Sequence, residues 1–196
     1  MLTFKECTLV KLDKTFGLRQ KKTDPVLEEW FSGEAPVSDL ERQVLLLFQE
    51  KLIANVHDWN ETELAYNFIG PVIALADYTT DNCNFFAEQF FGGIVDGVEM
   101  QGKPDGMIAS GTREPEQPYF CFQEYKKFKD PDGDSAGQAL SAMLVAQEIN
   151  EYHHPIYGGC VLGNSWYFMT LQNKTYCTSR GTLQPVNQTC LIFFGF

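Results

Sequence analysis

Apolar residues recur at helical spacing through the first part of the chain. Ser38 can cap a helix, and Glu41, three residues later, completes a capping box. The apolar positions of this helix are Leu40, Val44, Leu47, Phe48 and Leu52. A second helix is predicted to begin near residues 58–60, and Gly70-Pro71 should bend or interrupt it. Its predicted buried face consists of Leu64, Phe68 and Val72.

After residue 84 the pattern changes to short extended segments. Residues 84–100 are rich in phenylalanine, and a glycine pair within them suggests a bulge or a bend in a strand. The aromatic residues expected in the core or an interface are Phe85, Phe86, Phe90 and Phe91. Further segments are two strands (104–110 and 118–126), a loop (130–137), a helix (about 137–152), two strands (156–171) and a last strand (174–181).

This order of elements predicts a single α/β domain in which helices flank one central mixed sheet. We expect the core over about residues 58–181 and an N-terminal helical extension over residues 1–57. Within the core, Leu140, Met143, Leu144 and Gln147 should form the inner edge of the helix that begins near residue 137.

Composition narrows the class of protein. Hydrophobic residues make up 44% of the 196 residues and charged residues 21%, as in ordinary globular proteins. No apolar run reaches the roughly 18 residues of a membrane span, so we expect no membrane partner. The net charge of −11 argues against tight non-specific binding of DNA. None of the six cysteines forms a CxxC pair, and the first residues lack the apolar core of a signal peptide. A cytoplasmic protein with free thiols is therefore expected.

Three charged residues fall on two neighbouring predicted strands. Asp105 begins one strand, and Glu124 and Lys126 lie two residues apart on the next. Residues two apart project from the same face of a strand, here the face of Phe120 and Phe122. Charges at the end of a buried face are costly unless they are paired or bind an ion. Two carboxylates suit Mg²⁺ or Mn²⁺, and a neighbouring lysine can hold a water molecule and stabilise charge on a phosphate.

Pro104-Asp105, 18 further residues and then Glu124-Tyr125-Lys126 resemble the motif of the PD-(D/E)XK nuclease superfamily. The order of a helix, three strands, a helix and a strand over about residues 58–170 is also similar to its core. Three segments are similar to a group of uncharacterised bacterial proteins with this fold: WNETELAYNFIGPVIAL, PYFCFQEYKKF and QALSAMLVAQEIN. The resemblance implies a restriction-endonuclease-like core and a nuclease that uses Mg²⁺ or Mn²⁺ on DNA or RNA.

The resemblance also implies roles for individual residues. Asp105 and Glu124 would bind the metal, with the backbone carbonyl of Tyr125 as a further ligand, and Lys126 would position the attacking water. The superfamily often adds a glutamine near the start of the following helix, which here is Gln138.

The superfamily often adds an acid from the preceding helix as well, and Glu61 and Glu63 are both candidates. Glu61 is preferred, because it shares the inward stripe with Leu64 and Phe68.

Structural explanations stay open for several of these residues. Glu124 and Lys126 could form a solvated strand end. Glu63 could cap a helix with Asn60, Glu61 could do so with Asp58, and Gln138 could do so with Ser135.

Two other functions also stay open. The first is a nuclease-like fold that serves as a catalytically weak or inactive binding or regulatory module. The acidic composition and the apolar tail Leu191–Phe196, which could form a homodimer or partner interface, motivate it. The second is a metal-dependent enzyme for a small phosphorylated substrate, which would suit an acidic chain better than long DNA.

Overall fold

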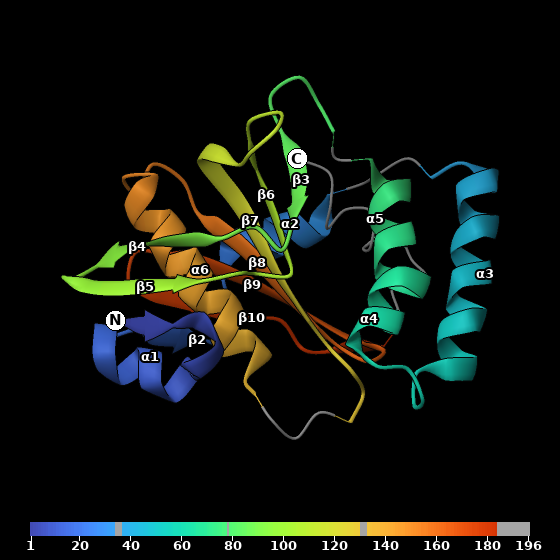
Figure 1. The fold of residues 1–196 in the computed structure, drawn as a ribbon, viewed down its shortest axis with the longest axis horizontal. Coiled ribbons are helices and arrows are strands. Elements are labelled where there is room, and N and C mark those ends of the chain that lie inside the picture. The colour runs from blue at the N-terminus through green and yellow to red at the C-terminus, as the bar shows by residue number, and fades with distance from the viewer. Residues whose placement is uncertain (34–36, 78, 130–132, 184–196) are drawn as a thin grey trace.

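A large mixed sheet divides the molecule, and helices cover both of its faces (Figure 1). The computed structural model describes residues 1–33, 37–77, 79–129 and 133–183. Within them the sheet contains β2 (Arg19–Lys21), β3 (Asn84–Ala87), β6 (Gly106–Ser110), β7 (Glu116–Lys126), β8 (Ile156–Leu162), β9 (Ser165–Gln172), β10 (Thr175–Thr178) and β11 (Thr182–Leu183). The strand order is β2-β10-β9-β8-β7-β6-β3, with β11 also paired to β9. The pairs β7–β8 and β2–β10 are parallel and the others antiparallel, which confirms the predicted mixed sheet.

The N-terminal segment contributes to both sheets of the molecule. The strand β1 (Leu2–Thr3) pairs with β5 (Val98–Gly102) in a separate three-stranded sheet, and β2 pairs with β10. The 3₁₀ turn η1 (Phe4–Glu6) and the helix α1 (Leu9–Phe16) lie between these strands, and α2 (Pro25–Ser32) follows them. The predicted helical extension over residues 1–57 therefore also contributes two short strands. Strands of two or three residues are too short to display a recognisable alternation.

The helix α3 (Asp39–Asn55) begins as predicted. The Ser38 N–H donates to the Glu41 carboxylate at 2.6 Å, and the Glu41 N–H donates to the Ser38 hydroxyl at 3.3 Å. The predicted apolar face is partly wrong, because Leu40 and Leu47 are mostly exposed. The buried residues are Leu45 and Leu52. As the outermost helix in Figure 1, α3 packs only a narrow stripe against the next helical layer.

The second predicted helix is interrupted where Gly70 and Pro71 fall, as expected. It consists of α4 (Glu61–Leu64), the π-helical turn η2 (Ala65–Ile69) and α5 (Gly70–Ala76). The Gly70 N–H donates to the carbonyl of Ala65, five residues earlier. Proline has no N–H and its ring would strike the carbonyl four residues before it, so the wider turn relieves that clash. The predicted buried face is confirmed for Leu64, Phe68 and Val72.

An apolar core lies on each face of the large sheet. Ile108 packs towards α3, η2 and α5, whereas its neighbour Met107 packs towards α6 (Ser135–Ile149). The small sheet, which includes β4 (Phe91–Val95), covers the other side of α6. A Cβ on Gly93 of β4 would lie 2.9 Å from Cγ1 of Val145 on α6. The helix is consequently buried on nearly all sides, including the predicted inner edge of Leu140, Met143, Leu144 and Gln147.

Residues 84–100 form parts of three strands instead of one. The backbone φ angles of Asp96 and Gly97 are +47° and +79°, so these residues make the tight turn of the β4–β5 hairpin. The glycine pair lies in regular pairing between β4 and β5, so of the two predicted alternatives, a bulge or a bend, the bulge does not occur there. Instead, Gly93 allows the close approach of α6.

A β-bulge does occur in β7, at a position that the sequence pattern did not indicate. The register with β6 shifts between Ile108 and Ala109, because Phe120 is an extra residue on β7. Phe120 therefore packs on the α3 side of the sheet, and Phe122 packs on the α6 side. The prediction that these two residues share a face is wrong. Beyond the bulge the regular alternation of faces resumes, so Glu124 projects from the same face as Phe122.

None of the helices in the described part of the chain combines the length and the apolar character that a membrane span requires. The five cysteines of this part are free thiols. The apolar tail Leu191–Phe196, predicted as a dimer or partner interface, lies outside the described residues.

Candidate functional site

Asp105 and Glu124 lie side by side on neighbouring strands. Gly106 of β6 is opposite Gln123 of β7, and the next position in this antiparallel register places Asp105 opposite Glu124. The Asp105 carboxylate accepts a hydrogen bond from the backbone N–H of Tyr125, with 2.5 Å between Oδ2 and N. The charge of Asp105 also acts on the neighbouring Glu124 carboxyl. The two acids therefore form one cross-strand pair.

Burial raises the pKa of both acids. Glu124 is only 3% exposed. Its burial, and to a lesser extent the charge of Asp105, holds the pKa of its carboxyl well above the usual value. Burial likewise raises the pKa of Asp105, although the Tyr125 N–H and the charge of Lys126 oppose this increase. The pair thus holds a proton more strongly than two separate carboxylates would. A bound cation would remove the repulsion that causes part of this effect.

Lys126 forms an ion pair with the acid that precedes it on α4. Its Nζ lies 3.3 Å from Oε1 of Glu61. Burial alone would lower the pKa of Lys126, but the Glu61 carboxylate and then the acid pair outweigh burial and raise it. Glu63 has a different role: its carboxylate accepts the Asn60 N–H at 2.9 Å and caps α4. The structure therefore places Glu61, and not Glu63, beside Lys126.

Gln138 lies in the beginning of α6 and is 7% exposed. The N-cap of α6 is Asp134, whose carboxylate accepts the Gly137 N–H at 2.9 Å. A capping role for Gln138 with Ser135 is therefore wrong.

Gln138 and Lys126 both lie close to Gly133. A Cβ on Gly133 would lie 3.2 Å from Nε2 of Gln138 and 4.0 Å from Cε of Lys126. The Gln138 amide and the Lys126 side chain thus both border Gly133.

The described residues contain no group of three or more His, Cys, Asp or Glu side chains arranged to hold a metal ion. Magnesium sites in proteins commonly use only one or two carboxylates and complete the shell with water and substrate oxygens. The acid pair of Asp105 and Glu124 supplies two such oxygen ligands, and the backbone of Tyr125 lies between Glu124 and Lys126 on the same strand. These residues fit a Mg²⁺ or Mn²⁺ site of that open type.

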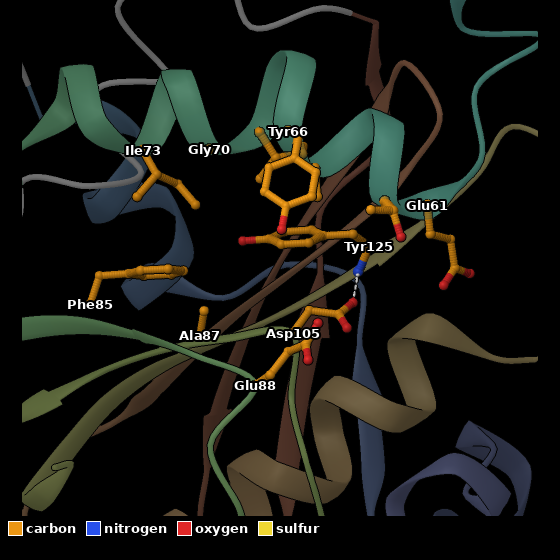
Figure 2. A pocket seen from close by; sticks show the side chains of 12 residues that line it. Glu61, Tyr66, Gly70, Ile73, Phe85, Ala87, Glu88, Asp105 and Tyr125 are labelled. Atoms are coloured by element: carbon orange, nitrogen blue, oxygen red, sulfur yellow. Dashed lines mark hydrogen bonds between the residues drawn. The ribbon is translucent and has the colours of Figure 1, made fainter.

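A cavity of about 300 Å³ opens beside Asp105, between the helical segment α4–η2–α5 and the strands β3, β6 and β7. Figure 2 shows Glu61 towards one end of the cavity and Ile73 and Phe85 towards the other. Tyr66 and Tyr125 lie between these ends. The cavity is therefore acidic near the carboxyl pair and apolar away from it.

Glu88 is a site residue that the sequence did not indicate. It lines the same cavity next to Asp105 (Figure 2), and its N–H donates to the Asp105 carbonyl at 3.3 Å. Its φ of +49° is uncommon outside glycine, and residues in such conformations cluster at functional sites. No periodicity or motif marks this position, because the conformation depends on contact with a distant strand.

The six residues singled out in the sequence lie at one end of the large sheet. The hydrogen bond from Tyr125 to Asp105, the strand pairing, the ion pair and the proximity to Gly133 connect them. They are Glu61, Asp105, Glu124, Tyr125, Lys126 and Gln138. The chain matches no model of a known protein family and no curated protein, so its function is inferred from this geometry.

Proposed function

We propose that the chain is a divalent-metal-dependent phosphodiester hydrolase with a restriction-endonuclease-like core, acting on DNA or RNA. The observation that carries the proposal is the pair formed by the half-buried Asp105 and the buried Glu124, beside the ion pair of Lys126 and Glu61. Two adjacent acids that are removed from much of the solvent are costly unless a proton or a cation lies between them. The order of α4–α5, β3, β6, β7, α6 and β8, with the β4–β5 hairpin inserted, supports the resemblance to the PD-(D/E)XK core.

Asp105, Glu124 and the backbone carbonyl of Tyr125 would hold Mg²⁺ or Mn²⁺, and Glu61 would contribute through a water molecule. The bound metal would supply a Lewis acid for a phosphoryl oxygen and lower the pKa of a bound water. The raised pKa values of the acids support this assignment, because the charge of a cation would stabilise their ionised forms.

The other residues act on the water and on the phosphate. The Lys126 ammonium is kept charged by Glu61, and it can donate hydrogen bonds to the attacking water and to a phosphate oxygen. The Gln138 amide borders Gly133, as the Lys126 side chain does, and it would orient either this side chain or the substrate. Lys126 thereby stabilises the negative charge that develops when water attacks phosphorus.

Calorimetric titration of Mn²⁺ and Mg²⁺ tests the metal site. We expect saturable binding by the wild type and by Glu63→Gln, whose carboxylate only caps α4, and loss of binding in Asp105→Ala. Cleavage of labelled single-stranded and duplex DNA and RNA should fall at least about 100-fold in Lys126→Ala, which should still bind metal. If Asp105→Ala retained both metal binding and cleavage, the assignment would be wrong.

The alternative binding module predicts a different result in the same experiment. The wild type would then bind no metal, even with a short oligonucleotide present to complete the ligand shell, and it would cleave no nucleic acid. The search would move to protein partners.

A further inference from the structure

The cavity beside the carboxyl pair has apolar walls that a metal centre does not need. Its volume of about 300 Å³ is at the lower end of the range for small-molecule sites. Ile69, Ile73 and Phe85 line the end away from Asp105, and Figure 2 shows Ile73 and Phe85 on that side. Such walls suit a flat apolar group whose charged part stays near Asp105.

Tyr66 is an exposed aromatic residue at this cavity. It is 78% exposed although it lines the cavity, and it belongs to the π-helical turn η2. This turn also supplies Ala65 and Ile69 to the cavity lining, and π-helical turns occur frequently at functional sites. The Tyr66 ring is therefore available to stack on a ligand instead of packing in the core.

The opposite wall is held in place by buried contacts. The Tyr125 hydroxyl donates a hydrogen bond to Oε1 of Gln123, and both residues are buried. Gly106 allows this wall to close, because a Cβ there would lie 2.6 Å from Cε2 of Phe85 and 3.1 Å from the Tyr125 hydroxyl. The cavity is thus bounded by a fixed aromatic wall and by the exposed ring of Tyr66.

The charges at the cavity select the kind of group that can enter. Glu61, Glu88 and Asp105 line it near the proposed metal site, so an anionic group would be repelled from the cavity itself. Carboxylates instead accept hydrogen bonds from the amino groups on the edge of a nucleobase. The group favoured by these walls is therefore a neutral, flat heterocycle with N–H donors, attached to a phosphate that stays at the metal.

We infer that this cavity receives one unstacked nucleobase, so that the substrate is a nucleotide within a single strand or a free nucleotide. The inference rests on the proposed function for the position of the phosphate, but other residues bind the base. A base in a duplex must first leave its stack, which costs a few kcal/mol. A chain with a net charge of −11 also lacks the bulk attraction that favours long duplexes.

The test compares a short fluorescein-labelled single strand with its duplex, both in Mn²⁺. The wild type should cleave the single strand at least about tenfold more efficiently, because the duplex must release a base. In Tyr66→Ala the KM for the single strand should rise about tenfold with little change in kcat, the effect of losing one base–aromatic stack. Tyr66→Phe should keep the wild-type KM, and Ala87→Phe, which fills the cavity, should raise it. Phe90→Ala removes an aromatic side chain that is 63% exposed outside this cavity and should change nothing.

The outcomes separate this inference from the proposed function. Equal cleavage of strand and duplex, or an unchanged KM in Tyr66→Ala while Asp105→Ala abolishes cleavage, would overturn the base site alone. If the wild type cleaves nothing but binds nucleoside monophosphates in a calorimeter, and Tyr66→Ala weakens that binding, the base site stands and the hydrolase proposal falls. Neither binding nor cleavage by the wild type would overturn both. Binding of monophosphates identifies a free nucleotide as a ligand, whereas binding of the oligonucleotide alone identifies a strand.

Discussion

Replacing Glu124 by Gln should stabilise the metal-free protein at neutral and alkaline pH. Glu124 is 3% exposed, and burial and the neighbouring Asp105 raise its pKa well above the ordinary value of 4.5. The folded protein therefore retains a proton at pH values where the unfolded chain has released it. Stability from this proton is complete below pH 4.5 and is lost as the pH rises through the folded pKa.

The size of the effect follows from proton linkage. While the folded protein holds one extra proton, the free energy of unfolding falls by up to about 1.4 kcal/mol for each pH unit. For a chain of this length that corresponds to about 3–5 °C in Tm per pH unit. Gln cannot ionise and has nearly the same shape, so in Glu124→Gln the free energy of unfolding should lack this part of its dependence on pH. The variant should match the wild type near pH 5 and exceed it increasingly at higher pH.

Thermal unfolding followed by circular dichroism in EDTA, from about pH 5 to about pH 9, measures the difference. Glu63→Gln is the control, because the Glu63 carboxylate is exposed. Asp105 makes the Tm of both the wild type and Glu124→Gln depend on pH, so the informative quantity is the difference between their curves of Tm against pH. Parallel curves for the wild type and Glu124→Gln would refute the reasoning. Added Mn²⁺ should raise the Tm of the wild type and leave that of the variant unchanged.

The remaining predictions concern packing and the ion pair. Leu52→Ala should lower the free energy of unfolding, measured by urea denaturation, by about 2–5 kcal/mol. Leu47→Ala, at a residue that is 51% exposed, should change it little, and equal losses would contradict the buried face described for α3. Gly93→Ala should cost about 1–3 kcal/mol, because its Cβ would lie 2.9 Å from a valine methyl of α6, and an unchanged Tm would rule out that close approach. Glu61→Gln should lower the pKa of Lys126, because burial then acts with less opposition. More of the Lys126 amine is then neutral at a fixed pH, so its acetylation, followed by mass spectrometry, should become faster. An unchanged rate would argue against the ion pair with Glu61.

Features encoded by neighbouring residues could be predicted from the sequence. The capping box of Ser38 and Glu41 and the interruption at Gly70-Pro71 depend on residues within a few positions of each other. The strands over residues 118–126 and 156–171 were also predicted, because their apolar segments are long enough to be recognised. The turn at Asp96-Gly97 was missed although Asp-Gly between apolar segments is a strong hairpin signal.

Features that depend on distant contacts could not be predicted. The bulge at Phe120 arises from the pairing of β7 with β6, and the buried stripe of α3 depends on which helices lie beneath it. In the site, the spacing of Asp105 and Glu124 predicted their proximity, because antiparallel neighbours bring such positions together. The cavity was not predicted, because its residues come from separate helices and strands without a shared motif.

The enclosure of α6 between two sheets has a consequence for local motion. Its backbone amides can exchange with solvent deuterium only if both coverings separate, so they should exchange at the slow rate of global unfolding. Gln138 is anchored in this most protected segment. On the opposite face of the large sheet, the π-helical turn η2 carries the exposed ring of Tyr66 and should exchange through local openings of lower free energy. The candidate site therefore has one rigid neighbour, α6, which carries Gln138, and one more mobile neighbour, η2, whose ring can adjust to a bound ligand.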